Sequence, residues 1–258
     1  MFPAGSFLFS FIISNGALVS INRIEVFSIL KLPLMKTTIK SLITFSFVLL
    51  LFSCKKESSP IAVERRPIDA DGNIYDTITI GTQCWMKSNL KTTHYNDGTP
   101  IPTGLSDADW SADTIGAYAV YDNNAVNDSI YGKLYNWYAL NTGKLAPAGW
   151  HVPTDDELTT LRTYLGGPYV AGGAMKATIL WNSPNTGATN SSGFTALPSG
   201  FRNYDGSYSN LGNYCYIWSS TPAHTGYARY CALFNSIAGA ATSTYNKVDG
   251  FAVRCVRN

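Results

Sequence analysis

Apolar and polar side chains alternate with a period of two at residues 77–80 and again at residues 251–256. That pattern is typical of strands with one buried face. Four Asp-Gly pairs along the chain supply the positive φ angles that tight turns between strands need. Together with runs rich in aromatic and β-branched residues, these signals predict six strands, at residues 73–80, 117–121, 194–202, 214–220, 227–234 and 251–256.

The strongest helix signal lies just after residue 153. Thr154 and Glu157 have the spacing of a capping box, in which each side chain satisfies a backbone N–H of the first turn. Leu158, Leu161 and Leu165 then share one face, and the Gly-Gly pair that follows ends the helix. This segment therefore predicts an amphipathic helix.

A second helix is predicted over residues 132–140, where Leu134, Trp137 and Tyr138 share a helical face. Residues 171–177 predict a further helical turn, and residues 181–192, rich in Asn, Gly, Ser and Pro, predict a long surface loop. Two main helices and a late run of strands indicate an α+β domain with mostly antiparallel strands.

The composition agrees with a folded domain rich in strands and turns. Hydrophobic residues make up 45% of the 258 residues and charged residues only 14%, which excludes a disordered chain. The 22 Gly, 12 Pro, 16 Tyr and 6 Trp argue against a coiled coil or a helical repeat. A formal net charge of +2 without a long basic run indicates no nucleic-acid partner.

The first 53 residues differ from the rest, because they hold 8 of the 12 Phe and none of the Tyr or Trp. Residues 35–40 are a short cationic start, and residues 42–52 form an apolar run that is short for a membrane span. Ser53 and then Cys54 follow this run. This order resembles a bacterial lipoprotein signal over residues 35–53, after which Cys54 becomes lipidated and N-terminal. The alternative is an ordinary signal peptide that happens to contain a cysteine.

The remaining boundaries follow from this signal. Residues 1–34 are interpreted as an over-extended start or an unstructured extension, because Met35 is itself a normal start for such a signal. Residues 54–68 are interpreted as a tether, and residues 69–258 as the exported domain. No acidic residue follows Cys54 directly, which favours a lipid anchor in the outer membrane of the cell envelope, with the domain facing the periplasm or the cell surface.

Four cysteines remain after Cys54: Cys84, Cys215, Cys231 and Cys255. An even count in an exported chain predicts two disulfides, with three possible connectivities. Cys215 and Cys231 lie on two predicted strands joined by a turn-rich link, so we expect them to pair. Cys84 would then pair with Cys255 and make the first and last strands adjacent. The alternative is that Cys215 and Cys231 are free buried thiols.

A series of short motifs runs through the domain. The longest are GTQCWMKSNL at residues 81–90, YGKLYNWY at 131–138 and GWHVPTD at 149–155, and others lie at residues 71–75, 187–190, 193–202, 218–221 and 253–256. In this order they resemble the Fibrobacter succinogenes major paralogous domain over roughly residues 69–257. That family occurs mostly in exported bacterial lipoproteins, and its function is uncharacterised. The resemblance implies a C-type lectin-like fold related to formylglycine-generating enzymes, and it implies no catalytic residues.

We expect a non-catalytic binding module for glycan or protein ligands. Tyr and Trp number 22 after residue 53, and such side chains stack on sugar rings and take part in protein contacts. The candidate ligand contacts in predicted loops are Trp110, Trp181, Tyr204 and Tyr208. The tryptophans inside the motifs are interpreted as core residues: Trp85, Trp137, Trp150 and Trp218.

Calcium is the cofactor that we consider for a lectin-like fold. Asp69, Asp71 and Asn73 carry oxygen ligands at alternate positions, which makes them weak candidate metal ligands. Their spacing does not fit an EF-hand loop, and a turn before the first strand explains these residues as well. No other cofactor is expected.

Two alternatives to a binding module stay open. One is a structural or adhesion building block, which the sequence does not distinguish from a binding module. The other is an enzyme related to formylglycine-generating proteins, in which Cys215 and Cys231 would be reactive. We find no convincing nucleophile–base pair, and His151, just before the predicted helix, is interpreted as a structural histidine.

Overall fold

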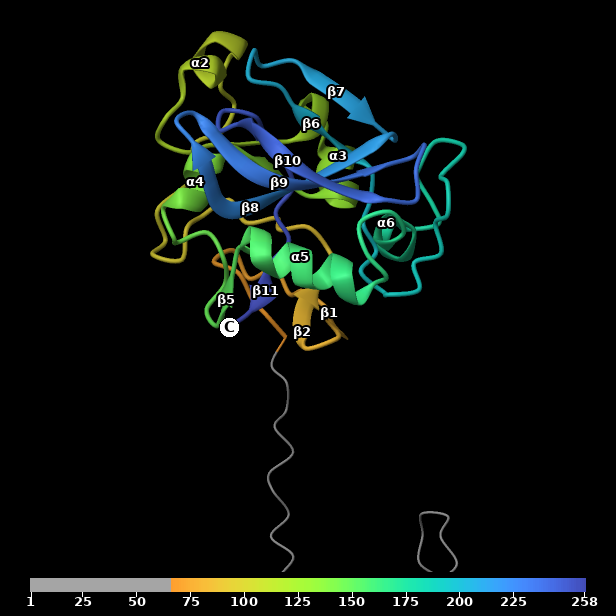
Figure 1. Cartoon of the computed structure of the whole chain (residues 1–258). Helices are drawn as coiled ribbons and strands as arrows, with labels where there is room; N and C mark the ends of the chain where they lie inside the picture. The colour runs from red at the N-terminus through yellow and green to blue at the C-terminus, as the bar shows by residue number, and fades with distance from the viewer. Residues whose placement is uncertain (1–65) are drawn as a thin grey trace, which may run out of the picture. The chain divides into compact units, whose positions relative to one another are not determined.

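The computed structural model describes residues 66–258, which form an α+β domain with two larger sheets and one small sheet (Figure 1). Helix α5 lies between the five-stranded and the four-stranded sheet. The strands are β1 (Thr77–Ile80), β2 (Gln83–Met86), β3 (Tyr118–Ala119), β4 (Leu134–Tyr135), β5 (Trp150–His151), β6 (Ser199–Arg202), β7 (Tyr208–Leu211), β8 (Tyr214–His224), β9 (Tyr227–Phe234), β10 (Ala240–Asn246) and β11 (Val256–Arg257). The helices are α2 (Asp107–Ala112), α3 (Ala125–Tyr131), α4 (Trp137–Asn141), α5 (Asp155–Tyr164), α6 (Ala171–Met175) and the short 3-10 helix η1 (Tyr121–Asn123).

The five-stranded sheet has the order β10-β9-β8-β6-β7, and its pairs are antiparallel except β6 with β8. The predicted strand at residues 227–234 is confirmed as β9, and the one at 214–220 is confirmed as β8, which continues to His224. Strand β10 was not predicted, because small polar residues dominate its sequence, yet it pairs with β9 along its whole length. Pairing with a neighbour outweighs the weak local signal.

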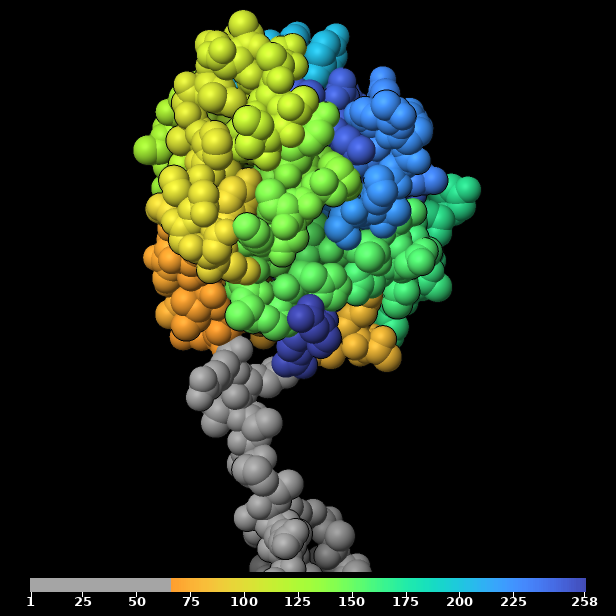
Figure 2. Space-filling view, turned by 90° about the vertical axis from the view of Figure 1, so that its left-hand side faces the viewer, coloured from red at the N-terminus to blue at the C-terminus, as the bar shows by residue number. Residues whose placement is uncertain are grey.

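The four-stranded sheet, with the order β1-β2-β11-β5, joins the two ends of the domain. Val256 of β11 pairs with both Trp85 of β2 and His151 of β5. The prediction that the first and last strands are adjacent is wrong, because β2 lies between them. A turn at Gly81, with φ 61°, folds residues 83–86 back onto β1 and leaves β2 as the neighbour of β11. Figure 2 shows the end of the chain (dark blue) beside the orange strands.

The predicted capping box is confirmed at the start of α5. The Thr154 hydroxyl accepts a hydrogen bond from the Glu157 N–H at 3.2 Å, and Glu157 Oε2 accepts one from the Thr154 N–H at 2.8 Å. The helical turn predicted at 171–177 is confirmed as α6, and residues 181–192 form neither helix nor strand.

The helix predicted over residues 132–140 is only half correct. Its first residues form β4, because the Tyr135 N–H donates to the Phe251 carbonyl at 2.8 Å and Tyr135 pairs with Tyr118 of β3. Asn136 then caps α4 by accepting a hydrogen bond from the Ala139 N–H. Helices α2 and α3 were not predicted, because each is shorter than two turns and depends on packing for its stability.

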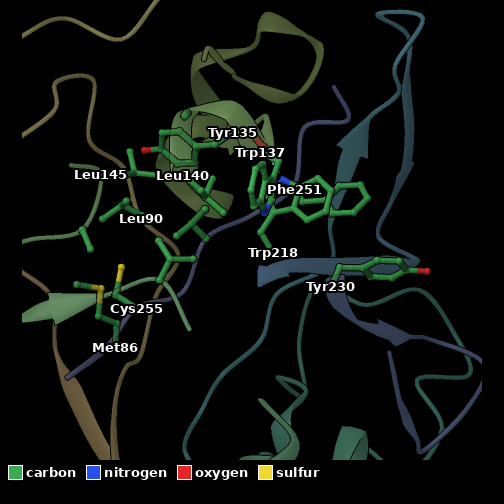
Figure 3. Packing of buried hydrophobic residues seen from close by; sticks show 14 of the residues in the cluster. Met86, Leu90, Tyr135, Trp137, Leu140, Leu145, Trp218, Tyr230, Phe251 and Cys255 are labelled. Carbon is green, nitrogen blue, oxygen red and sulfur yellow. Dashed lines mark hydrogen bonds between the residues drawn. The ribbon is translucent and has the colours of Figure 1, made fainter. Parts of the chain in front are cut away.

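Apolar side chains pack on both faces of the five-stranded sheet. One face contacts α5, α6 and the four-stranded sheet through residues that include Trp85, Leu158, Leu161, Met175, Ile217 and Val256. The other face contacts β4 and α4 through residues that include Tyr135, Trp137, Trp218 and Phe251 (Figure 3). The prediction that the motif tryptophans belong to the core is confirmed, since all four are at most 8% exposed.

A buried guanidinium connects the C-terminal segment to the rest of the domain. Arg254 is 0% exposed, and its Nη1 donates to the carbonyls of Phe194 and Met86. Its Nε and Nη2 donate to Asn89 Oδ1 at 3.2 and 2.8 Å. Its guanidinium carbon also lies 4.5 Å from the centre of the Phe194 ring. Burial lowers the pKa of Arg254 to about 10, so the group stays charged at neutral pH.

We predict that Arg254→Met destabilises the domain by several kcal/mol, about 3–5, because it leaves Asn89 and two carbonyls without donors. Urea unfolding measures the change. Arg229→Met is the matched control, since Arg229 is an exposed residue of β9 and its loss should change stability by at most about 0.5 kcal/mol. Equal effects of the two substitutions would contradict the role given to Arg254.

Candidate binding face

Two of the four candidate ligand contacts are core residues, so their prediction as surface aromatics is wrong. Trp110 is 0% exposed, because α2 places it against Gly250 and 4.4 Å from the Arg202 guanidinium. Trp181 is 9% exposed, and its Nε1 donates to the Ala196 carbonyl at 3.0 Å. The loop at residues 181–192 therefore buries Trp181 although most of its residues are of types common in surface loops.

The other two candidates lie near the β6–β7 turn. Tyr204 is 55% exposed, whereas Tyr208 begins β7 and is partly buried. The Tyr208 ring lies 5.2 Å from the Arg202 guanidinium and 5.2 Å from the Tyr121 ring, so it supports the fold at this point. Ligand contact by Tyr204 or Tyr208 stays a prediction.

A different set of aromatic side chains shares one face of the five-stranded sheet. Alternate residues of a strand point to the same side, and paired residues share a face. The register pairs Tyr214 of β8 with Phe234 of β9, and it places Tyr245 of β10 on the face of Tyr230. We call Tyr214, Tyr216, Tyr230, Phe234 and Tyr245 the tyrosine face.

The rings of the tyrosine face contact each other edge to face. The ring centres of Tyr214 and Phe234 lie 4.8 Å apart at 85°. Those of Tyr216 and Tyr230 lie 5.1 Å apart at 86°, and those of Tyr230 and Tyr245 lie 5.7 Å apart at 84°. This geometry is favourable for aromatic pairs, and it holds the rings in fixed orientations.

The tyrosine face is partly open to solvent. Tyr216 and Tyr230 are only 6% and 8% exposed, whereas the other three rings are half-buried. On the same face, Ala241 and Ser243 of β10 are exposed. Figure 3 shows Tyr230 at the edge of the packed cluster with its hydroxyl directed away from the other labelled residues. The β9–β10 side of the sheet therefore presents aromatic rings at the surface.

A buried carboxyl group lies beside these phenols. Asp249 is 0% exposed, and neither of its oxygens accepts a hydrogen bond of normal geometry from the described residues, although the Tyr204 backbone amide lies near enough to act on its charge. Burial raises the pKa of Asp249 to about 7, with a smaller contribution from Asp205, and the Tyr204 backbone amide opposes this only in part. The Asp249-Gly250 pair was predicted as a turn, but Gly250 pairs with Arg202 and so carries Asp249 into the interior.

A model of the Fibrobacter succinogenes major domain family matches residues 78–257, which is more than half of the chain. The chain belongs to this family. No curated protein matches the chain, and no solved structure matches it. The match confirms the resemblance and includes the whole tyrosine face.

Sequence reasoning missed this face because it searched the loops for ligand contacts and treated aromatic residues in strands as core. The sequence does hold one signal for this face: Tyr214, Tyr216 and Trp218 occupy alternate positions of one predicted strand, which places their rings on the same side. In this family domain, that strand carries one aromatic stripe from the buried centre of the sheet to its partly open end.

The residues considered for calcium form a hydrogen-bonded turn. The Asp69 carboxylate accepts hydrogen bonds from the N–H groups of Asp71 and Asn73 and, at 2.5 Å, from the Tyr75 hydroxyl. Asp71 in turn contacts His94 at 2.5 Å. Within residues 66–258, no group of three or more His, Cys, Asp and Glu side chains could hold a metal ion. Calcium binding here stays a prediction.

The structure contains neither predicted disulfide, since Cys84, Cys215, Cys231 and Cys255 are all free and buried. Strands β8 and β9 are adjacent as predicted, but their register places Ile217 opposite Cys231 and leaves the two cysteines offset. Burial raises the pKa of Cys215 to about 11 and that of Cys231 to about 12. Both thiols are therefore protonated at neutral pH.

His151 has partners at both ring nitrogens. Its Nδ1 lies 2.6 Å from Asn258 Oδ1, and its Nε2 lies 2.7 Å from Glu157 Oε1. Glu157 also belongs to the capping box of α5. The histidine thus connects β5, α5 and the C-terminus, as a structural residue does.

We predict that the free energy of unfolding falls, relative to Asp249→Asn, as the pH rises from about 4 to above 7. Between its unfolded pKa of 3.8 and its folded pKa of about 7, Asp249 keeps a proton only in the folded state. The stability that Asp249 contributes is therefore fully present below its pKa in the unfolded state and is lost as the pH rises through its pKa in the folded state. Urea unfolding of both proteins across this range should show a change of at most roughly 4 kcal/mol in their difference.

The matched control is Asp156→Asn, because Asp156 is exposed on the first turn of α5. The difference in the free energy of unfolding between Asp156→Asn and the wild type should stay nearly constant over the same pH range. A constant difference for Asp249→Asn would contradict the burial of an unpartnered carboxyl group.

Proposed function

We propose that this protein is an exported, lipid-anchored envelope protein whose domain binds glycans, without catalysis, through the tyrosine face. The partly exposed aromatic stripe on β8, β9 and β10 is the observation that carries the binding function. Phenol rings offer apolar surface to the C–H faces of sugars, and their hydroxyls offer hydrogen bonds at the rim. We further propose that the fold is C-type lectin-like, which the α+β architecture with both ends of the described domain in one sheet supports.

Glycans fit this face better than an apolar protein partner does. The exposed neighbours on β10 are small, namely Ala241 and Ser243, so they leave the partly exposed ring of Tyr245 open to a ligand from the β10 side. The phenols are protonated at neutral pH, and burial raises the pKa of Tyr216, Tyr230 and Tyr245 further above the usual value of 10. Protonated phenols both donate and accept hydrogen bonds, as sugar hydroxyls require.

The anchoring part of the proposal rests on the sequence. The signal at residues 35–53 and Cys54 lie outside the described residues, as do residues 1–34 and most of the tether at 54–68. In residues 66–258, no helix has the length and apolar character needed to cross a membrane. Acylation of Cys54 would attach the domain to the outer membrane.

We predict that Tyr245→Ala and Phe234→Ala each weaken glycan binding by the full-length lipoprotein about tenfold, because each removes a partly exposed ring from the face. Glycan-array screening followed by titration calorimetry in detergent measures the loss. The matched control is Tyr164→Ala, since Tyr164 is 65% exposed at the end of α5, where its ring lies against Gly81 of the turn between β1 and β2. If all three variants bind like the wild type, the tyrosine face is not the binding surface.

We predict that the wild-type chain incorporates a radiolabelled fatty acid in the producing cell and that Cys54→Ser abolishes the label. The lipoprotein signal places the acylated cysteine at this position and no other. Cys84→Ser controls for loss of a cysteine elsewhere and should keep the label, because Cys84 is a buried core residue. Label retained in Cys54→Ser would contradict the anchor.

A further inference from the structure

One edge of β10 carries no neighbouring strand, because β10 lies at the end of the five-stranded sheet. Successive residues of a strand direct their backbone N–H and C=O groups to opposite edges. The Ala240 N–H donates to the Pro168 carbonyl at 2.8 Å, on the side away from β9, so Thr242 and Thr244 direct their backbone groups to that side too. Among the described residues, nothing is hydrogen-bonded to these groups of Thr242 and Thr244.

This free edge lacks the features that usually keep another strand from adding to a sheet. Such features are charged or proline residues on the edge, a bulge, or a covering loop. Residues 240–246 contain no Asp, Glu, Lys, Arg or Pro, and their register with β9 has no irregularity. Their exposed side chains, Ala241 and Ser243, are small. The edge can therefore accept another strand from Thr242 onwards.

A cavity of about 670 Å³ lies at the end of this edge where β10 begins. Its walls are the link between α5 and α6, which includes Tyr169, and residues 237–242. Tyr169 is 87% exposed and Ile237 is 45% exposed, so two large apolar side chains of the cavity are open to solvent. A cavity with such walls accepts an apolar side chain.

A buried cation without a counter-charge lines the same cavity. Arg162 is only 9% exposed, and within residues 66–258 no carboxylate forms an ion pair with it. Its Nε, Nη1 and Nη2 donate to the Leu158 carbonyl, the Ala240 carbonyl and Thr159 Oγ1 at 3.4, 3.2 and 2.9 Å. A guanidinium has five N–H groups, so these contacts leave donors free for a ligand. A carboxylate satisfies both the free donors and the charge.

We infer that the domain binds the C-terminal segment of a partner protein as an added strand on β10. The segment runs antiparallel to β10 and exchanges backbone hydrogen bonds with Thr242 and Thr244. Its terminal carboxylate binds Arg162, and its last side chain, which is apolar, enters the cavity beside Tyr169 and Ile237.

The direction of the segment and its free end follow from the neighbours of Ala240. The outer edge of β10 is already occupied there, because the Ala240 N–H donates to Pro168 and its carbonyl accepts from Arg162. An added strand must therefore end beside Thr242, at the cavity and the guanidinium. Since β10 begins at this end, a strand that finishes here with its carboxyl group is antiparallel to it. An acidic side chain inside a longer strand would instead direct the following residues into the α5–α6 link.

The inferred site is separate from the tyrosine face. Thr242 and Thr244 alternate with Tyr245 along β10, so their side chains lie on the opposite side of the sheet. The cavity contains none of the residues that define the tyrosine face. Binding of a peptide can therefore succeed or fail independently of glycan binding.

The test uses two pools of biotinylated hexapeptides that are randomised at their last four positions. The pools differ only at the C-terminus, which is a free carboxylate in one and an amide in the other. Capture by the full-length lipoprotein in detergent, followed by mass spectrometry, should enrich peptides from the free-acid pool alone, and their last residue should be apolar. Fluorescence anisotropy of the most enriched peptide then measures its Kd. Amidation of its C-terminus should raise that Kd about tenfold, and so should N-methylation of the alternate backbone nitrogens that face β10.

Three substitutions and one control assign the binding to this site. Thr244→Pro removes an outward N–H without removing a hydrogen bond to β9, and it should weaken binding about tenfold. Tyr169→Ala should weaken binding about fivefold, whereas the control Tyr164→Ala, which removes an exposed ring outside the cavity, should leave the Kd unchanged. Arg162→Gln should make the acid and the amide bind equally. Because Arg162 also holds β10, Thr244→Pro and Tyr169→Ala decide the test if Arg162→Gln does not fold.

Several results would overturn the inference while leaving glycan binding in place. One is the absence of any enriched peptide with a Kd below about 100 μM. Another is equal binding of the acid, the amide and the N-methylated peptide by the wild type. Peptide binding that Thr244→Pro and Tyr169→Ala leave unchanged places the peptide elsewhere. A dimer that sedimentation velocity detects without peptide, and that Thr244→Pro abolishes, shows that a second copy of the chain covers the edge instead.

Discussion

The buried guanidinium of Arg254 is the constraint on which the rest of the structure depends. A charge removed from water must find acceptors at defined positions, or the domain loses several kcal/mol. Its acceptors come from Met86, Asn89 and Phe194, which lie 60 to 168 residues away along the chain. The end of β2, the segment before β6 and the C-terminal segment must therefore meet in one arrangement.

A second buried cation follows the same principle. Lys176 is 0% exposed, and its Nζ donates at 2.9 Å to three backbone carbonyls, those of Thr186, Phe234 and Ile237. Burial lowers its pKa to about 8. These bonds hold the end of β9 and the link to β10 against the segment after α6. The open side of the tyrosine face is thus positioned by a contact on the opposite side of the sheet.

The two faces of the five-stranded sheet have different surroundings, and this difference underlies the proposed function. One face is covered by α5, α6 and the four-stranded sheet, so its aromatic and aliphatic side chains are buried in the core. The other face is covered by β4 and α4 around Trp218 and Phe251, and Tyr245 of β10 packs on this cluster, with its ring centre 5.4 Å from that of Phe251, while it stays partly exposed. The proposed function uses the aromatic rings at this margin, which the sheet holds in fixed positions.

The sequence by itself determined the features that depend on neighbours a few residues apart. These are the capping box of α5, strands β8 and β9, the core tryptophans inside the family motifs and the family itself. Tertiary structure alone decided the rest: that residues 134–135 pair as a strand, that Trp110 is buried, that Cys215 and Cys231 are offset, and that Asp249 is buried. The physical reason is that capping and alternation are local, whereas register and burial depend on partners far away in the chain.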